Sequence, residues 1–278
     1  MLQRGTGKVA GAPIACVGAG TGLGECYLTA DMGGDYSCHA SEGGHAEFSP
    51  RNLEQVHLQS HLKQKFQEAH RVSVERVVSG PGILSVYEYF VKTLAREVDP
   101  AFSKQLETAG DLKPALIAQN EDCALCRRTM ALFMSQYGAE AGVACCKWIP
   151  RGGLYLTGGI TSKNMAQVSD PDGLFMKSLV DKGRLSGLVQ SIPVYAVLVE
   201  DLGERGAHWQ AFRLYQRHMG PPAATAATAA AIATATSAAA AATAVSAASS
   251  DPDTFVLTLS IAAAAAVAGF VLGRAVRP

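Results

Sequence analysis

The stretch Ser41-Glu42-Gly43-Gly44-His45 holds two ionisable side chains on either side of a glycine pair. Glycine is a poor helix former, so the spacing of Glu42 and His45 predicts a loop rather than one helical turn. Glycine also lacks a Cβ atom and lets a ligand approach the backbone. A carboxylate and an imidazole accept and donate hydrogen bonds, which suits a polyhydroxylated ligand. The alternative interpretation is an ordinary solvated turn.

A second glycine-rich stretch, Gly18 to Gly24, follows the short apolar run Ile14 to Val17, and this order predicts a strand that enters a turn. A dinucleotide fingerprint would need glycine in place of Leu23, and no Gly-Lys-Ser/Thr closes the stretch as it would in a P-loop. What remains is a Gly-Thr turn between two strands, which offers backbone N–H groups and one hydroxyl to a phosphate. Taken alone, the turn is better explained as an ordinary hairpin.

A third stretch, Val72 to Gly82, places Glu75 before a Ser-Gly-Pro-Gly break. By itself, Glu75 is interpreted as a surface acid paired with a neighbouring arginine. In the order GAGTGLG, EGGH and V-S-x-E-R-V-x-S-G-P-G, however, the three stretches resemble the bacterial-type glucokinases, which are ATP-dependent sugar kinases of the actin-like ATPase superfamily. The resemblance continues through Leu156-Thr157-Gly158-Gly159-Ile160 and covers about residues 11–219.

This resemblance implies an α/β domain with α+β layers, of the actin-like ATPase or ribonuclease H-like kind. It implies an enzyme that uses ATP and Mg²⁺ to convert D-glucose to glucose 6-phosphate in the cytoplasm, as a homodimer. The implied site residues fall into three groups: Glu42, His45 and Glu75 for the sugar, Gly20, Thr21 and Gly22 for the phosphates, and Gly158 and Gly159 for the nucleotide.

The remaining pattern alternates strands and helices, as expected for a layered domain. Ser49 is predicted to be an N-cap, with Pro50 the first residue of a helix. Asp99 to Asp111 is predicted to be a polar connector. Strands are expected at 25–29, 36–40, 153–157 and 193–200, and helices at 83–96, 121–147, 175–182 and 207–218. The helix after Pro50 has a predicted apolar face of Leu53, Val56, Leu58, Leu62 and Phe66.

The 278 residues include 24 basic and 24 acidic side chains, so the formal net charge is zero and no broad attraction to nucleic acid is implied. Seven cysteines without a secretory signal predict reduced thiols inside the cell. Cys123 and Cys126 form a CxxC pair, but a zinc site would need a second pair, so packing within a helix is the preferred interpretation. His57, His61 and His70 are expected to be surface or capping residues, and no metal site is predicted.

The C-terminal part differs in composition from the rest. Residues 220–253 are rich in Ala, Thr and Ser, which predicts a low-complexity linker. Residues 254–273 carry no charge and are long enough to cross a bilayer as a tail helix. The alternative is an alanine-rich tail without a membrane role.

Bacterial-type glucokinases begin with a small domain that carries an Asp-x-Gly-Gly-Thr motif and the general-base aspartate, and nothing similar precedes Gly18. No catalytic residue is therefore predicted in this sequence. Two hypotheses account for this departure. The chain is an N-terminally truncated glucokinase sequence, or it is a non-catalytic sugar-binding or regulatory homologue that lacks the base.

Overall fold

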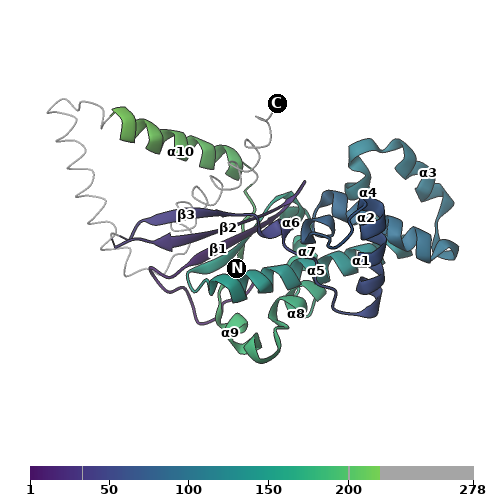
Figure 1. Cartoon of the computed structure of the whole chain (residues 1–278), viewed down its shortest axis with the longest axis horizontal. Coiled ribbons are helices and arrows are strands. Elements are labelled where there is room, and N and C mark those ends of the chain that lie inside the picture. The colour runs from purple at the N-terminus through teal and green to yellow at the C-terminus, as the bar shows by residue number, and fades with distance from the viewer. Residues whose placement is uncertain (33, 200, 220–278) are drawn as a thin grey trace. The chain divides into compact units, whose positions relative to one another are not determined.

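Five strands form one sheet in the order β3-β2-β1-β4-β5 (Figure 1). Strand β1 (Ile14–Ala19) pairs antiparallel with β2 (Leu23–Ala30), and β2 pairs antiparallel with β3 (Tyr36–Ser41). Strand β4 (Gly153–Thr157) runs parallel to β1, and β5 (Val194–Ala196) runs parallel to β4. Strands β1 and β4 are almost wholly buried, which explains their nearly continuous apolar sequences.

The computed structural model describes residues 1–32, 34–199 and 201–219. It divides into two units, Met1–Glu200 and Asp201–Pro278. The first unit contains the sheet, and the described part of the second is the helix α10 (Leu202–Met219). Within the described ranges, none of the helices combines the length and the apolar character that a bilayer span requires. The predicted linker at 220–253 and the predicted tail helix at 254–273 lie outside the described residues.

The other helices belong to the first unit, where α2, α3 and α4 gather at one end and α5 lies beside the sheet (Figure 1). Single 3₁₀ turns connect several of them. The turns are η1 (Gly43–His45), η2 (Val74–Arg76), η3 (Ala95–Glu97), η4 (Gly110–Leu112) and η5 (Gly183–Leu185). The helices are α1 (Leu53–Phe66), α2 (Gly80–Thr93), α3 (Pro100–Thr108), α4 (Lys113–Gln119), α5 (Ala124–Trp148), α6 (Gly159–Lys163), α7 (Met165–Ser169), α8 (Leu174–Val180) and α9 (Ser186–Ser191).

Helix α5 is the longest element, and α8 packs closely along it. Two glycines in its interior, which lower helix propensity, lie at this contact. A methyl group on Gly138 would overlap the carbonyl oxygen of Phe175, and one on Gly142 would overlap that of Leu179. The fully buried Tyr137 packs edge-on against Phe175 at the same place. The glycines therefore favour close helix packing at a cost in local propensity.

Several predictions about element boundaries are wrong. Helix α1 begins at Leu53 and is capped by Asn52, whose side chain accepts a hydrogen bond from the backbone N–H of Gln55 at 2.9 Å. Ser49 is exposed and caps nothing. The predicted connector after Asp99 is helix α3, because the Asp99 carboxylate accepts from the first backbone N–H groups and Pro100 occupies the first turn, where its missing N–H costs nothing. Strand β5 is also shorter than the predicted strand at 193–200.

The predicted apolar face of α1 is only partly confirmed. Leu58 and Leu62 are fully buried and Phe66 is half-buried, but Leu53 and Val56 are 77% and 43% exposed. The polar Gln55 takes an inner position instead, where its side chain accepts from the backbone N–H of Arg51 at 2.6 Å. A local hydrogen bond at the helix start thus displaces two apolar side chains from the core.

Asn52→Ala is expected to lower the free energy of unfolding by about 0.5–2 kcal/mol, because it leaves the N–H of Gln55 without its cap. Ser49→Ala is the matched control, and an exposed substitution of this kind should change stability by less than about 0.5 kcal/mol. Urea unfolding of the two variants measures both values. A larger loss for Ser49→Ala would contradict the observed helix start.

Candidate active site

The predicted phosphate turn joins β1 to β2. The backbone N–H of Gly20 donates to the carbonyl of Gly22 at 2.8 Å, which closes the turn. No atom lies within 4 Å of the position that a Cβ atom on Gly20 would occupy, and the side chain of Thr21 is exposed. The turn therefore presents an open glycine and a hydroxyl to the outside. This hairpin is the one that the sequence predicts.

The two predicted nucleotide glycines lie beside this turn because β1 and β4 are parallel. Gly18 pairs with Thr157 in the register, so the carboxyl ends of both strands meet at one edge of the sheet. Gly158 has φ +90° and ψ 157°, and a methyl group there would overlap the carbonyl oxygen of Ala19. Gly159 has nothing within 4 Å of its Cβ direction. Gly158 thus serves close packing, and Gly159 faces open space.

The predicted sugar residue Glu42 caps the turn η1, and His45 is the last residue of this turn, which is a single 3₁₀ turn rather than the expected loop. His45 Nε2 lies 3.8 Å from Glu42 Oε2, and their side chains are 34% and 70% exposed. Both glycines between them face the sheet. A methyl group on Gly44 would overlap the carbonyl oxygen of Leu23, and one on Gly43 would overlap Glu25 Oε2. The glycine pair therefore lets the turn pack closely on β2. The sequence interpretation instead explains these glycines by the approach of a ligand to the backbone.

Glu75 lies on η2, and its side chain contacts Leu23, the residue on which Gly44 of η1 also packs. Its Oε2 accepts a hydrogen bond from the backbone N–H of Leu23 at 2.9 Å. The expected pairing with an adjacent arginine is wrong, since Arg71 donates to the carbonyl of His45 at 2.7 Å instead. The turns η1 and η2 are joined by a backbone hydrogen bond from Val74 to Ala46, 2.9 Å long. Leu23 is therefore the point at which the phosphate turn and both predicted sugar segments meet.

Ser79 is a positioning residue that the sequence interpretation treated only as part of a break. It caps α2 by accepting from the N–H of Gly82 at 3.0 Å, and it donates to the carbonyl of Glu75 at 2.7 Å. The next residue, Gly80, donates its backbone N–H to the carbonyl of Gly20 at 2.8 Å. Helix α2 therefore begins three residues before the predicted Ile83, with its first turn tied to both Glu75 and the phosphate turn.

Tyr137 is a second residue that sequence reasoning missed. Its hydroxyl lies 2.7 Å from Oγ1 of Thr161, which in turn donates to the carbonyl of Thr157 at 2.8 Å. Burial raises the pKa of the Tyr137 phenol, while hydrogen bonds to Thr161 and to the Ala19 backbone oppose that rise. This buried chain joins α5 to α6 and β1 directly behind Gly158. A tyrosine within a long helix carries no local signal of such a role.

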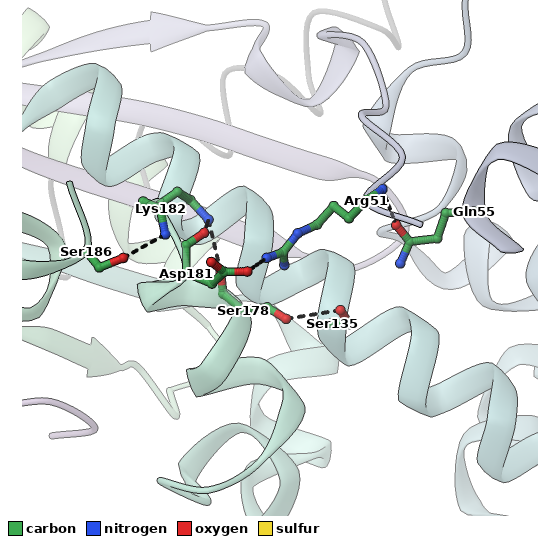
Figure 2. A network of polar contacts seen from close by, with 7 residues as sticks. All are labelled: Arg51, Gln55, Ser135, Ser178, Asp181, Lys182 and Ser186. Carbon is green, nitrogen blue, oxygen red and sulfur yellow. Dashed lines mark hydrogen bonds and ion pairs between the residues drawn. The ribbon is translucent and has the colours of Figure 1, made fainter. Parts of the chain in front are cut away.

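A polar network anchors the chain between η1 and α1 (Figure 2). Arg51 forms an ion pair with Asp181, which follows α8. The neighbouring Lys182 donates its backbone N–H to Ser186 Oγ at 3.1 Å and its Nζ to the carbonyl of Ser178 at 2.9 Å. Ser178 Oγ lies 3.0 Å from Ser135 Oγ on α5. The network ties the start of α1 to α8 and α5.

Within the part of the chain that the structure describes, no group of three or more His, Cys, Asp or Glu side chains is placed to hold a metal ion. Cys123 is not in mid-helix as expected. It caps α5, and its Sγ accepts from the N–H of Cys126 at 3.4 Å. His57 and His70 are exposed, and His61 is half-buried against the ring of Tyr89.

Comparison with known proteins identifies the family to which this site belongs. The sequence model of the family described as Glucokinase matches residues 1–214. The chain belongs to the glucokinase family. It is 40% identical over 206 residues to the glucokinase of Synechocystis sp., and the match covers 70% of this chain and 57% of that protein. It is 37% identical over 218 residues to the glucokinase of Trichormus variabilis, with 73% and 62% covered. The chain thus spans about 60% of the length of these relatives.

Solved structures of glucokinases have the same fold. The glucokinase of an Antarctic psychrotroph superposes with a TM-score of 0.56 at 24% identity, covering 70% of this chain and 56% of that one. The glucokinase of Balamuthia mandrillaris, determined in complex with glucose, gives a TM-score of 0.55 at 19% identity, with 68% and 50% covered. The predicted α/β fold is thereby confirmed, and it is the fold of glucokinases.

Proposed function

We propose that this chain is the sugar- and nucleotide-binding part of a glucokinase that transfers the γ-phosphoryl group of ATP to the 6-hydroxyl of D-glucose. One observation carries the proposal. The predicted sugar residue Glu75 accepts the N–H of Leu23, the residue that follows the predicted phosphate turn. A phosphoryl transfer enzyme must hold its acceptor and its donor phosphates next to each other. Membership of the glucokinase family supports the same reaction.

In this proposal Glu42, His45 and Glu75 hold hydroxyl groups of glucose. Carboxylates accept hydroxyl protons, and an imidazole donates or accepts one hydrogen bond at each ring nitrogen. Glu42 and His45 are partly exposed and 3.8 Å apart, so they are accessible to a ligand while still constrained by each other. A site built to pair hydroxyl groups discriminates strongly against sugars that lack them.

The nucleotide is proposed to lie along the sheet edge formed by the carboxyl ends of β1 and β4. Backbone N–H groups of Gly20 to Gly22 and the exposed Thr21 hydroxyl would bind phosphate oxygens, and the open space at Gly159 would admit the nucleoside. Ligands of open α/β sheets bind at such an edge. Mg²⁺, when bound with ATP, supplies charge neutralisation at the phosphates.

All seven cysteines are free thiols, as expected for a protein of the cytoplasm.

Two measurements on the 278-residue chain test this proposal. Titration calorimetry with D-glucose and with ATP measures binding, and a coupled dehydrogenase assay for glucose 6-phosphate measures turnover. Saturable binding of both D-glucose and ATP is the expected result, and ATP-dependent product formation would rule out the non-catalytic homologue. Glucose binding without ATP binding would contradict the nucleotide site and favour the sugar-binding homologue. Absence of glucose binding would contradict the sugar site itself. Homodimer formation stays a prediction.

A further inference from the structure

Two buried carboxyl groups lie behind η1, the turn that carries the predicted sugar residues. Glu25 on β2 and Glu140 on α5 are 6% and 7% exposed, and Glu140 is one of the groups that raise the pKa of Glu25. Among the residues that the structure describes, no N–H or O–H group donates to either oxygen of Glu25. A buried carboxyl group without a hydrogen-bond donor disfavours its charged form. Glu25 therefore holds a proton.

The surrounding charges decide which partner keeps the proton. Lys147 Nζ on α5 lies 3.9 Å from Glu140 Oε1, and Lys182, which follows α8, also attracts the Glu140 carboxylate. Glu25 borders the neutral thiol of Cys26 on its own strand. Burial, and then the neighbouring Glu140, raise the pKa of the Glu25 carboxyl group to about 8. The negative charge thus belongs to Glu140, and Glu25 is the protonated partner at neutral pH.

Glu25 also supports the sugar turn. A Cβ atom on Gly43 would overlap Oε2 of Glu25 and lie 3.2 Å from its Cβ, so the Gly43 backbone rests directly on this side chain. Glu25 pairs in the sheet with Ser41, whose Oγ accepts the N–H of Gly43 at 3.0 Å. The partly exposed Glu42 directly precedes Gly43, and the partly exposed His45 is the last residue of η1. The position of the turn therefore depends on the shape and charge of the Glu25 carboxyl group.

We infer that Glu25 is a positioning residue of the sugar site. The protonated, uncharged carboxyl group of Glu25 stays in place under Gly43, and this holds Glu42 and His45 where the glucose ligand needs them. Loss of that proton places two like charges side by side in the protein interior, which is costly and displaces the turn. The inference rests on the proposed function, because it concerns the same sugar site.

Titration of the full chain with D-glucose between about pH 6 and pH 9.5 tests the inference. The Kd of the wild-type chain is expected to be constant up to about pH 8 and then to rise by up to about tenfold per pH unit, because binding must restore the lost proton. Glu25→Gln keeps a donor toward Glu140 without titrating, so it should bind glucose normally at pH 7 and lack the alkaline rise. Glu88→Gln, a surface variant on α2 beside Lys65, should keep the rise.

A second measurement on the same proteins does not involve the sugar. The folded chain retains a proton on Glu25 that the unfolded chain releases near the ordinary pKa of 4.5. The Tm of the wild-type chain should therefore fall relative to that of Glu25→Gln as the pH rises from about 5 to about 8, with a constant difference above that range.

The outcomes separate the two proposals. Parallel Tm profiles for the wild-type chain and Glu25→Gln would overturn the proton on Glu25. Diverging Tm profiles with the same alkaline rise in glucose Kd for both proteins would overturn the positioning role alone. Absence of glucose binding at every pH would overturn the proposed function, and the positioning role with it.

Discussion

Glu75→Gln is expected to raise the Kd for D-glucose by about 10- to 100-fold. Hydrogen bonds to a charged group contribute about 1.5–3 kcal/mol, and the amide retains the shape of the side chain but not its charge. The amide oxygen can still accept the N–H of Leu23, so the turn η2 and the fold should be unchanged. Equal Tm values for the variant and the wild-type chain check this point.

The measurement is titration calorimetry with D-glucose at neutral pH. Glu68→Gln, an exposed carboxylate just beyond the end of α1, is the matched control and should bind glucose with the wild-type Kd. If Glu75→Gln also binds glucose with the wild-type Kd, Glu75 does not contact the sugar, and its role is limited to holding Leu23.

Gly158→Ala is the second large prediction, with an expected loss of about 2–5 kcal/mol in the free energy of unfolding. The backbone of Gly158, at φ +90° and ψ 157°, lies in a region that only glycine adopts readily, which costs another residue about 1–3 kcal/mol. The added methyl group would also overlap the carbonyl oxygen of Ala19, and overpacking of this kind costs about 1–3 kcal/mol.

Gly159→Ala provides the matched control, because this glycine has an ordinary φ and open space in its Cβ direction. Its free energy of unfolding should stay within about 1 kcal/mol of the wild-type value. Denaturant unfolding distinguishes the two variants, and equal losses would contradict the close contact between Gly158 and Ala19. The ATP affinity of the folded Gly159→Ala variant then reports whether the open space receives the nucleotide.

The positions of most strands and the hairpin turn at Gly20 could be predicted from sequence, because apolar runs ending in glycines leave a strong local pattern. The start of α1 could not. Ser49 and Asn52 are both good N-cap types, and the choice between them depends on which residues of α1 reach the core. Burial of Leu58 and Leu62, with the local bond between Arg51 and Gln55, favours the later start.

The candidate site was predictable only in part. The resemblance to glucokinases pointed to Glu42, His45 and Glu75, and the structure places them on two turns joined around Leu23. The resemblance does not indicate Glu25 as a site residue, because an acidic residue in a strand looks like an ordinary solvent-facing position. Its partner Glu140 comes from a helix far along the chain, and local patterns carry no information about such a contact.

Leu23 links the predicted phosphate turn to both segments that carry the predicted sugar residues. Its N–H holds Glu75 and its carbonyl lies against Gly44, while the residue before it, Gly22, closes the predicted phosphate turn. We therefore expect a displacement of the hairpin by one proposed ligand to be transmitted to the residues around the other. Thermodynamics requires such coupling to be reciprocal, so in the proposed site the factor by which nucleotide changes the affinity for sugar would equal the factor by which sugar changes the affinity for nucleotide.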